Sequence, residues 1–350
     1  MTKIRIAVAG AGMIGQAHIR VLGTSPSCML SAIVDPSPAA VEVAIKEGVP
    51  LYKTIGELLT TNRPDGLILA TPNQLHVSQA LQCMEAKLPI LLEKPIAITV
   101  AQGEKIVDMV AATDAKVLIG HHRAHSPIMA KAKEVVDSGK LGKLVAFMGS
   151  AMFFKPDHYF VDAPWRKELG AGPILINMIH EVHNLRMLCG EIVSVQAFGS
   201  YAIRGFAVED TVAINFRFAN GVLGTFMLSD VAASAKSWEQ TSQENKSYAN
   251  YDDEDCYVIT GTNGALSVPT MRLKSYPRLE DRSWWKAFDV SVVSMVREDP
   301  LKLQIEHFGA VIRGEAQPLV SAYDGLQNLR VTEAIFESTK TGLAVALNVH

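Results

Sequence analysis

Short apolar runs alternate with segments of helical periodicity over the first third of the chain. The apolar runs are Ile4–Ala9, Leu30–Val34, Gly66–Ala70, Ile90–Leu92 and Lys116–Ile119. The helical segments that follow the first four run through 18–22, 39–46, 74–85 and 101–111. Strands of this length separated by helices predict βαβ units. Because the runs are apolar without interruption, they predict a parallel sheet that is buried on both faces.

The pattern changes after Gly120, where one helix, Pro127–Asp137, leads into a series of strand-like segments. These segments are Leu144–Phe153, Val193–Ile203, Thr211–Phe218, Val222–Leu228 and Cys256–Thr260. Two more helices are predicted at Leu301–Arg313 and Asp324–Lys340. Consecutive strands indicate an α+β domain with a large open, mainly antiparallel sheet.

We therefore expect two domains, residues 1–122 with the parallel sheet and residues 123–350 with the antiparallel one, which is also reasonable for a chain of 350 residues. Asn220-Gly221 suits the turn of a hairpin between two of the later strands. The polar stretch Ser237–Asp255 is expected to form a long surface loop.

Composition and charge exclude several classes of partner. The net charge of −3 gives no electrostatic reason to expect nucleic acid or an anionic membrane. No apolar run reaches the ~20 residues of a membrane span, and Lys3 and Arg5 interrupt the first apolar run, so that no signal peptide is expected. The four cysteines are widely spaced without a CxxC pair, which favours a reducing compartment. We expect a cytoplasmic protein.

A glycine-rich turn, Gly10-Ala11-Gly12-Met13-Ile14-Gly15, separates the first predicted strand from the first predicted helix. In such a turn the first glycine permits a tight turn and the second lets the backbone approach a pyrophosphate. The third glycine allows close packing of helix and strand, and the N–H groups of the helix start attract the anion. The motif predicts a Rossmann domain that binds a dinucleotide; a glycine-rich turn without a ligand is the alternative.

An acidic residue, Asp35, ends the second predicted strand, 20 residues after the last glycine of the motif. A carboxylate at this position can accept hydrogen bonds from the ribose hydroxyls of the dinucleotide. Asp35 is followed by Pro36-Ser37-Pro38, and no Arg or Lys is present there to bind a 2′-phosphate. The sequence therefore favours NAD over NADP.

Five further motifs follow the glycine-rich turn along the chain. They are Ala70-Thr71-Pro72-Asn73-Gln74-Leu75-His76, Glu93-Lys94-Pro95, Gly120-His121-His122-Arg123, Trp165-Arg166 and Gly170-Ala171-Gly172 with His180. In these motifs the chain resembles the glucose–fructose oxidoreductase / inositol 2-dehydrogenase / rhizopine catabolism (Gfo/Idh/MocA) family over nearly its whole length. The resemblance implies a Rossmann domain followed by a domain with a large open sheet, and an NAD(P)-dependent dehydrogenase or reductase that acts on CH–OH groups.

The resemblance also implies roles for individual residues. Lys94 would contact the reacting hydroxyl and His180 would be the general acid/base. Contacts to the dinucleotide are implied for Gly10, Ala11, Gly12, Met13, Ile14, Asp35, Thr71, Pro72, Asn73, His76, Glu93 and Lys94. Contacts to the substrate are implied for Arg123, Trp165, Arg166, Asn177 and His183. An Arg beside the cleft could anchor hydroxyls or a carboxylate.

The chain departs from the family pattern at two positions around His180. Sugar and inositol dehydrogenases of this family commonly have an Asp four residues before that His and another three residues after it. Here these positions are Ile176 and His183. His183 shares a helix face with His180 and could orient it, touch substrate or be structural. The specificity for sugars therefore cannot be carried over directly.

Each site residue also has a structural interpretation. Lys94 could be a solvated surface lysine and His180 a core histidine. A zinc site formed by His180, His183 and the histidines at 121, 122 and 125 lacks the cysteine or carboxylate ligands that complete such sets. No metal is therefore expected.

The preferred function is hydride transfer between a nicotinamide cofactor and a secondary alcohol or ketone of a cyclic polyol, sugar derivative or cyclic hydroxy compound. The alternatives are an NAD-dependent glycosidase with transient hydride transfer and a non-catalytic dinucleotide-binding regulator. A homodimer or homotetramer is expected, because an open sheet with one face uncovered needs a partner to bury it.

Overall fold

The computed structural model describes residues 2–168 and 170–348 and divides into two compact units. The first unit consists of residues up to 125 together with Asp299–Leu329, and the second of Ser126–Glu298 with the chain from Arg330 on. The expected division at residue 122 therefore differs from the structure by three residues at this boundary and in the segment Asp299–Leu329, which belongs to the first unit. The physical reason is that Ile305 and Phe308 of this segment are buried in the core of the first unit.

The first unit contains a six-stranded sheet in which every strand pairs parallel to its neighbours, as predicted. The strands are β1 (Ile4–Ala9), β2 (Cys28–Val34), β3 (Leu51–Tyr52), β4 (Gly66–Leu69), β5 (Ile90–Glu93) and β6 (Val117–Gly120). Their order is β3-β2-β1-β4-β5-β6. The sequence did not predict β3, which has too few residues for a periodicity to be recognised. All residues of β4, β5 and β6 are buried, which explains their continuous apolar character.

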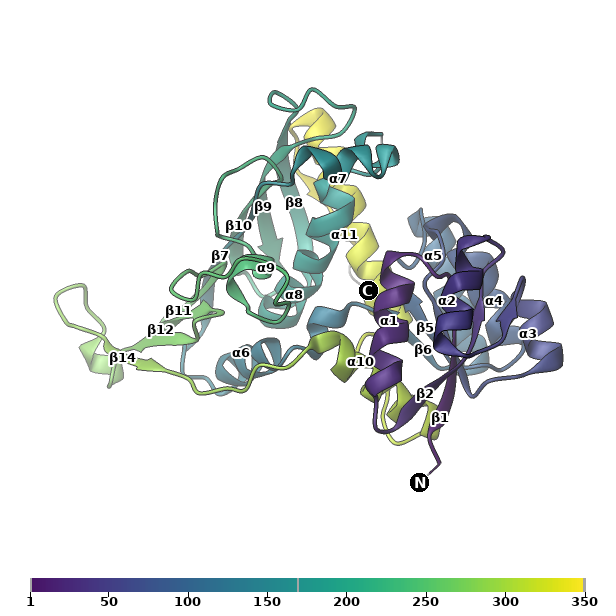
Figure 1. The fold of residues 1–350 in the computed structure, drawn as a ribbon. Coiled ribbons are helices and arrows are strands. Elements are labelled where there is room, and N and C mark those ends of the chain that lie inside the picture. The colour runs from purple at the N-terminus through teal and green to yellow at the C-terminus, as the bar shows by residue number, and fades with distance from the viewer. Residues whose placement is uncertain (1, 169, 349–350) are drawn as a thin grey trace. The chain divides into compact units, whose positions relative to one another are not determined.

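The helices of this unit are α1 (Met13–Thr24), α2 (Ala39–Glu47), α3 (Ile55–Thr61), α4 (His76–Glu85), α5 (Val100–Thr113) and α10 (Pro300–Arg313), together with the 3₁₀ turns Asn73–Leu75 and His122–His125. Helix α1 packs against β2 and α10, and α4 packs against α5 (Figure 1). Close packing reaches the backbone at Gly66, where an added Cβ would lie 2.5 Å from Ile312 of α10.

The second unit contains a nine-stranded mixed sheet that is antiparallel except between β7 and β10. Its strands are β7 (Leu144–Met152), β8 (Ile192–Ser200), β9 (Thr211–Phe218), β10 (Leu223–Ser229), β11 (Tyr257–Gly261), β12 (Gly264–Val268), β13 (Arg272–Ser275), β14 (Asp289–Val292) and β15 (Val345–Ala346). Their order is β14-β13-β12-β11-β7-β10-β9-β8-β15. The hairpin at Asn220-Gly221 is confirmed, and Gly221 has the positive φ of 89° that favours glycine there.

Helical segments of the second unit are α6 (Pro127–Asp137), α7 (Asp157–Val161), the 3₁₀ turn Pro164–Lys167, the π-helical turn Ile174–Met178, α8 (Ile179–Cys189), α9 (Trp238–Thr241) and the 3₁₀ turn Leu279–Asp281. Helix α11 (Ala322–Thr341) follows near the end of the chain, and the division between the units lies within it. No described helix is both long and apolar enough to cross a bilayer.

The expectation of a surface loop over Ser237–Asp255 is wrong at its start. Ser237 caps the short helix α9, and both Ser237 and Trp238 are buried. The indole Nε1 of Trp238 donates a hydrogen bond to Glu244 at 2.9 Å. A polar residue of this stretch thus provides the acceptor for the N–H group of a buried side chain. Residues 245–253 are exposed, as expected for a loop.

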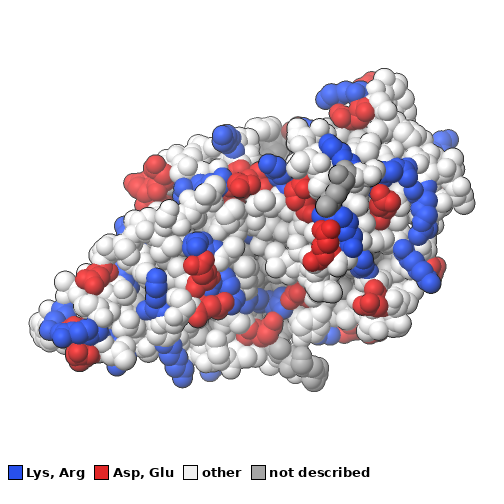
Figure 2. Space-filling view, turned by 90° about the horizontal axis from the view of Figure 1, so that it is seen from below, with Lys and Arg blue, Asp and Glu red and all other residues white. Residues whose placement is uncertain are grey.

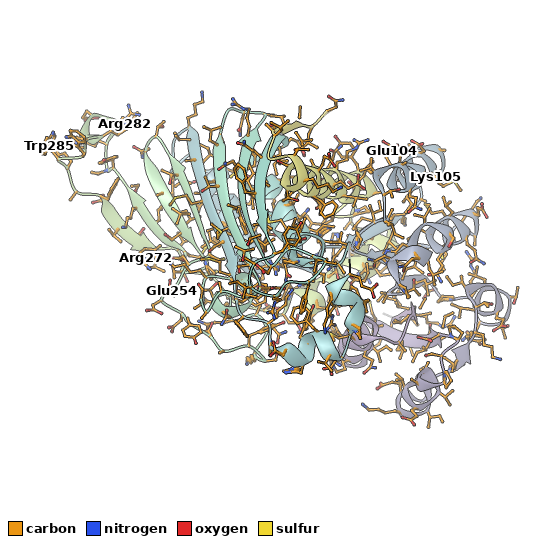
Figure 3. The ribbon with its side chains drawn as sticks, turned by 90° about the horizontal axis from the view of Figure 1, so that it is seen from above. Glu104, Lys105, Glu254, Arg272, Arg282 and Trp285 are labelled. Carbon is orange, nitrogen blue, oxygen red and sulfur yellow. The ribbon has the colours of Figure 1, made fainter. Side chains whose placement is uncertain are left out.

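The nine-stranded sheet has one face whose side chains are exposed within the chain. Large apolar residues on this face are Met148, Phe198, Leu223 and Met227. Beyond it, the connection between β13 and β14 carries Trp284 and Trp285, which are 87% and 84% exposed. Figure 3 shows Trp285 and Arg282 at the outer end of this sheet. On the face of the molecule shown in Figure 2, basic and acidic side chains are interspersed, so that this face has no continuous surface of one sign.

Candidate active site

The strand order of the first unit reverses between β1 and β4, and open parallel sheets bind ligands outside the carboxyl ends of the strands at such a point. The residues predicted to bind the dinucleotide follow these strand ends. Gly10 follows β1, Asp35 follows β2, Thr71 follows β4 after one residue, and Glu93 ends β5. The fold therefore brings together motifs that are far apart in the sequence.

Gly10 and Gly15 have the tight-turn and close-packing roles that the sequence predicted, and the role predicted for Gly12 stays a prediction. Gly10 has φ +91°, and a Cβ there would lie 2.4 Å from the carbonyl oxygen of Ala70. At Gly15 a Cβ would lie 1.9 Å from the carbonyl oxygen of Gly10, so that a side chain would separate α1 from β1. A Cβ at Gly12 would enter open space, which is the space that a pyrophosphate needs next to the backbone.

The N-terminus of α1 is suited to an anion. Its N-cap is Gly12, no side chain caps the first turn, and the first turn contains no acidic residue. The N–H groups at the start of a helix and the helix dipole favour a negatively charged ligand at such an end. Together with the space at Gly12 and the acid at the end of β2, this turn fits a dinucleotide.

Asp35 also holds the glycine-rich turn, a role that the sequence did not predict. Its Oδ2 accepts a hydrogen bond from the N–H of Ala11 at 2.7 Å, and its Oδ1 accepts one from Ser37 at 2.8 Å. Partial burial opposes ionisation, but these hydrogen bonds hold the pKa of Asp35 below its ordinary value. The ionised carboxylate thus joins the ends of β1 and β2.

His76 lies at the start of α4 and is fully buried, so that its ring positions backbone instead of facing a ligand directly. Nδ1 lies 2.7 Å from the carbonyl oxygen of Pro95, and Nε2 lies 3.0 Å from that of Thr71. Burial lowers the pKa of His76, although both carbonyl oxygens oppose this effect. The ring links the Thr71 loop to Pro95, and the Lys94-Pro95 peptide bond is cis.

Glu93 pairs with His18 of α1, a partner that no sequence pattern indicated. Glu93 Oε1 lies 2.8 Å from His18 Nε2, and both side chains are buried. Burial opposes ionisation of the carboxyl group, but the hydrogen bond and charge of His18, together with Lys94, lower the pKa of Glu93. Gly120 makes room for this pair, because a Cβ there would lie 2.9 Å from Glu93.

His122 is neutral at physiological pH because burial, with the nearby charge of Arg123, lowers its pKa to about 3, although Glu93 opposes the shift. Arg123 itself is only 4% exposed, in the 3₁₀ turn that follows β6. Its predicted contact to substrate is therefore limited to the small part of the side chain that reaches the surface. The charged Lys94 and Glu93 thus lie near the neutral His122 at the ends of β5 and β6.

The neutral state of His122 gives a prediction for stability against pH. The pKa of His122 is lower in the folded state than in the unfolded state. Between pH 6.5 and pH 3 the unfolded chain therefore binds a proton at His122 that the folded chain does not bind. The folded state loses stability as the pH falls through this range. At pH 5 the loss attributable to this group should reach up to about 2 kcal/mol. Denaturant unfolding at pH 7 and pH 5 should show a smaller difference for His122→Gln than for the unmodified protein. The exposed His158→Gln is the control, and an equal difference in all three would contradict the assignment.

In the second unit, His180 and His183 lie on α8 and are each 7% exposed. Helix α8 is preceded without a break by the π-helical turn Ile174–Met178. Such turns are rare and occur frequently at functional sites. Asn177 belongs to this turn and lies three residues before His180, so that the predicted catalytic and substrate-binding residues of this segment are adjacent.

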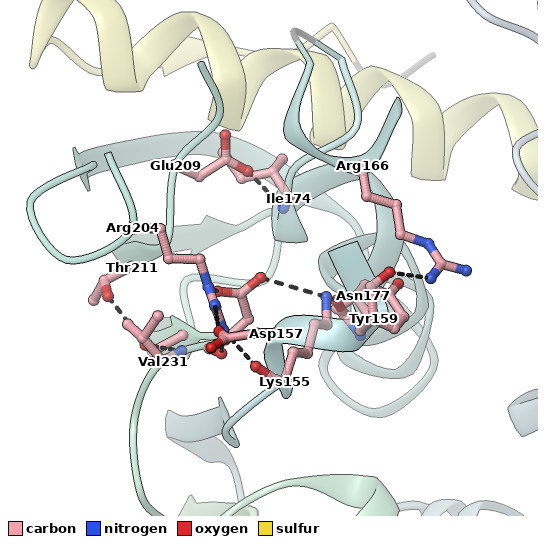
Figure 4. Close-up of polar contacts among 12 residues, drawn as sticks. Lys155, Asp157, Tyr159, Arg166, Ile174, Asn177, Arg204, Glu209, Thr211 and Val231 are labelled. Carbon is pink, nitrogen blue, oxygen red and sulfur yellow. Dashed lines mark hydrogen bonds and ion pairs between the residues drawn. The ribbon is translucent and has the colours of Figure 1, made fainter. Parts of the chain in front are cut away.

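Trp165 and Arg166 lie in a 3₁₀ turn next to α7. Arg166 Nη1 donates to the carbonyl oxygen of Tyr159 at 2.7 Å, and its guanidinium carbon lies 3.7 Å from the centre of the Tyr159 ring. Trp165 is 54% exposed. Both residues are thus placed on the segment that also contributes Tyr159, as Figure 4 shows for Arg166.

A buried polar cluster that the sequence did not predict surrounds Lys155 (Figure 4). Lys155 Nζ donates to Asn177 Oδ1 at 2.8 Å and lies 3.6 Å from Asp230. Asp230 pairs with Arg204 Nε at 2.9 Å. Lys155 and Asp230 follow β7 and β10, whose parallel pairing places both strand ends at one edge of the sheet. The sequence predicts the two strands but not their parallel pairing. The neighbourhood of Lys155 and Asp230 therefore could not be predicted.

In the described part of the chain, no group of three or more His, Cys, Asp or Glu side chains is arranged to hold a metal ion.

Comparison with known proteins agrees with the geometry. Residues 4–121 match a family described as "Oxidoreductase family, NAD-binding Rossmann fold", and residues 129–267 match the GFO/IDH/MocA C-terminal domain. The chain is 26% identical over 356 aligned residues to scyllo-inositol 2-dehydrogenase (NAD(+)) of Bacillus subtilis, covering 99% of this chain and 97% of that protein. It is 28% identical to the rhizopine catabolism protein MocA of Rhizobium meliloti, covering 96% and 95% of the two chains.

Solved structures show the same fold. The WlbA dehydrogenase of Bordetella pertussis, in complex with NADH and UDP-GlcNAcA, superposes with a TM-score of 0.79 at 21% identity and covers 100% of both chains. The family matches together span well over half of the chain, and the relatives align over nearly its full length. The chain belongs to the GFO/IDH/MocA family of NAD-binding oxidoreductases.

Proposed function

We propose that this oxidoreductase transfers hydride between NAD and a secondary alcohol or ketone of a cyclic polyol, sugar derivative or related cyclic hydroxy compound. The observation that carries the proposal is that Lys94 follows β5 at the dinucleotide-binding edge of the first unit, while the second unit presents His180 next to Asn177. A protein that only bound the dinucleotide would not need either side chain.

Two protein groups complete the chemistry of a secondary alcohol. The bound nicotinamide supplies the hydride acceptor for oxidation or the hydride donor for reduction. His180 takes the hydroxyl proton in oxidation and returns it in reduction, since an imidazole exchanges protons near neutral pH. The ammonium group of Lys94 favours the alkoxide over the alcohol and polarises the carbonyl group in the reverse direction.

Relatives support the class of substrate without determining the compound. The Bacillus subtilis relative is named for an inositol and NAD, and the WlbA structure contains NADH with a UDP-linked sugar acid. The inositol and the sugar acid are both cyclic and carry secondary hydroxyl groups. At 26% identity the substrate of this chain is proposed only at the level of this shared chemistry.

A spectrophotometric screen tests the proposal. The protein is incubated with NAD or NADP and a panel of inositols, aldoses, uronic acids, cyclic dihydrodiols and glycosides, and absorbance at 340 nm is followed. Net NADH formation that depends on Lys94 and His180 supports the dehydrogenase. Hydrolysis of a glycoside with no net change in NADH would indicate the glycosidase instead. Tight binding of dinucleotide without any turnover would indicate a regulator.

Cofactor preference is the next prediction. The ionised Asp35 should repel a 2′-phosphate, so the protein should bind NAD more tightly than NADP. The double variant Asp35→Ser/Pro36→Arg should shift the ratio of the two Kd values toward NADP by about 10-fold or more, since a lost repulsion and a new charged hydrogen bond act together. Titration of NADH and NADPH fluorescence measures both values. Equal or tighter NADPH binding by the unmodified protein would refute the preference.

We also propose that the chain forms a dimer or tetramer through the uncovered face of the nine-stranded sheet. Support comes from the exposed apolar residues on that face, with Phe198 at 61% and Met148 at 58% exposed, and from the exposed Trp284 and Trp285 beyond it. Apolar surface of this kind usually becomes buried by association. Light scattering at micromolar concentration should give an oligomer for the unmodified protein. Met148→Glu/Phe198→Glu should shift it toward monomer, and an unmodified monomer would refute the proposal.

A further inference from the structure

The turn that precedes His180 is held from two sides by buried charged residues. At its start, Glu209 Oε1 accepts a hydrogen bond from the N–H of Ile174 at 2.8 Å. In its middle, Asn177 Oδ1 accepts one from Lys155 at 2.8 Å. Glu209 and Lys155 are 3% and 9% exposed, and neither belongs to the helix. The π-helical turn Ile174–Met178 is therefore fixed by its surroundings.

Lys155 is itself held firmly. Its ammonium group lies 3.6 Å from Asp230 and near the rings of Phe153 and Tyr159, with its nitrogen 5.5 and 5.1 Å from their centres. Asp230 cannot turn away, because Arg204 binds its carboxylate through Nε at 2.9 Å. A buried ammonium group that has a carboxylate and an amide as partners keeps its position. Any other buried position would leave the charge without a partner, which costs free energy.

Arg204 also joins the two chain segments that carry this ion pair. Its Nη2 donates to the carbonyl oxygens of Lys155 and Asp230, each at 2.7 Å. The charged and titratable groups that act on Lys155 are Asp230 after β10, Glu239 of α9 and Arg204 after β8, with the Tyr159 ring of α7 beside its ammonium nitrogen. Burial lowers the pKa of Lys155 to about 8, although Asp230 and Glu239 oppose this shift, so that the lysine is mainly protonated at neutral pH.

The position of Asn177 connects this cluster to the predicted chemistry. Asn177 and His180 are three residues apart on one continuous helical segment, where such neighbours share a face. A π-helical turn contains one more residue per turn than an α-helical one and so sets the direction in which the following side chains point. A change at Asn177 would therefore rotate the start of α8, which carries His180.

We propose that Lys155 is a positioning residue for His180: through its hydrogen bond to Asn177 it fixes the π-helical turn and thereby the direction of the His180 ring. This proposal rests on the proposed function, in which His180 exchanges the proton of the substrate. Lys155 is not placed among the reacting groups; its effect on the rate passes through the helix.

A double-mutant cycle separates this role from direct contact with substrate. Lys155→Met should lower kcat by about 10- to 100-fold in the unmodified background, because misplacing a reacting group by ~1 Å can cost about 10²-fold. In the His180→Ala background, Lys155→Met should change the residual rate less than about 2-fold, since the group that it positions is absent. Residual rates are followed in single turnovers. A reduction by the same factor in both backgrounds would overturn the proposal.

Controls separate positioning from loss of the fold. Lys246→Met removes the same charge from an exposed lysine of the same unit and should leave kcat unchanged. NADH binding should be the same in all variants, because the dinucleotide-binding turn belongs to the first unit. If Lys155→Met does not fold, Asp230→Asn replaces it in the cycle. Asp230→Asn keeps the shape of the side chain but removes the negative charge that pairs with Lys155. The decrease in kcat should again depend on His180, and it should be smaller than for Lys155→Met.

A second readout does not depend on turnover. The Cε1–H signal of His180 in the NMR spectrum is assigned as the signal that disappears in His180→Ala. Lys155→Met should shift this signal in the unliganded protein, whereas Lys246→Met should not. An unchanged signal in a folded Lys155→Met protein would overturn the proposal even if no substrate of the panel were oxidised. The failure of the proposed function, which is absence of turnover in the unmodified protein, is thus distinguished from the failure of the positioning role.

Discussion

Lys94→Ala and His180→Ala should each lower kcat by roughly 10²–10⁴-fold, the range found for a positioned acid/base. In the proposed reaction, the developing alkoxide would lose its charged partner without Lys94. The hydroxyl proton would lose its acceptor without His180. Initial rates at saturating NAD, with the best substrate of the panel, measure both effects.

Dinucleotide binding should persist in both variants, because in the proposed site the glycine-rich turn and Asp35 would hold the pyrophosphate and ribose groups. Lys105→Ala and His158→Ala are matched controls at exposed positions and should retain normal rates. Figure 3 shows Lys105 on the side of α5. A parallel loss of NADH affinity and rate in Lys94→Ala or His180→Ala would indicate that the residue supports the fold instead of the reaction.

The dinucleotide-binding half could be predicted from the sequence because its signals are local. The roles of Gly10, Gly12 and Gly15 depend on a single turn, and Asp35 directly follows a strand that is recognised by its own apolar run. Each signal needs only neighbouring residues to be read. The parallel sheet followed from repeated strands and helices of ordinary length, and the structure confirms it.

What could not be predicted depends on contacts between distant residues. His18 and Glu93 form a buried pair although they are 75 residues apart in the sequence. The residues that flank each of them in the sequence do not predict this pairing. Helix α10 was predicted with nearly its correct ends, but its amphipathic pattern does not say which sheet it covers. The chain returns to the first unit at Asp299 for this reason.

The Lys155 cluster was missed for a related reason. Lys155 and Asp230 each follow a strand that the sequence predicted, but β7 and β10 are far apart in the chain and pair in parallel within a mainly antiparallel sheet. Only that pairing makes the two residues neighbours. The π-helical turn before α8 also has no local signal, because Glu209 and Lys155 hold it from outside the helix.

Substrate choice should follow from the two positions at which this chain leaves the family pattern, Ile176 and His183. An aspartate can accept hydrogen bonds from two neighbouring hydroxyl groups, whereas a neutral imidazole offers one donor and one acceptor and an isoleucine offers neither. Both residues lie on the same helical segment as His180, and His183 is only 7% exposed. A ring with fewer hydroxyl groups, or with an apolar portion beside the oxidised carbon, should therefore bind better than a free hexose or inositol.

Free myo-inositol and glucose should accordingly be poor substrates, with kcat/KM below about 10⁴ M⁻¹s⁻¹. The double variant Ile176→Asp/His183→Asp should raise kcat/KM for myo-inositol by about 10²-fold, because hydroxyl groups that were left without partners in the pocket regain acceptors. The matched variant Ile176→Asn/His183→Asn, which is polar but uncharged, should give a smaller gain. Efficient oxidation of myo-inositol by the unmodified protein, or no gain in either variant, would show that these two positions do not set the specificity, and attention would move to the Arg166 and Trp165 side of the site.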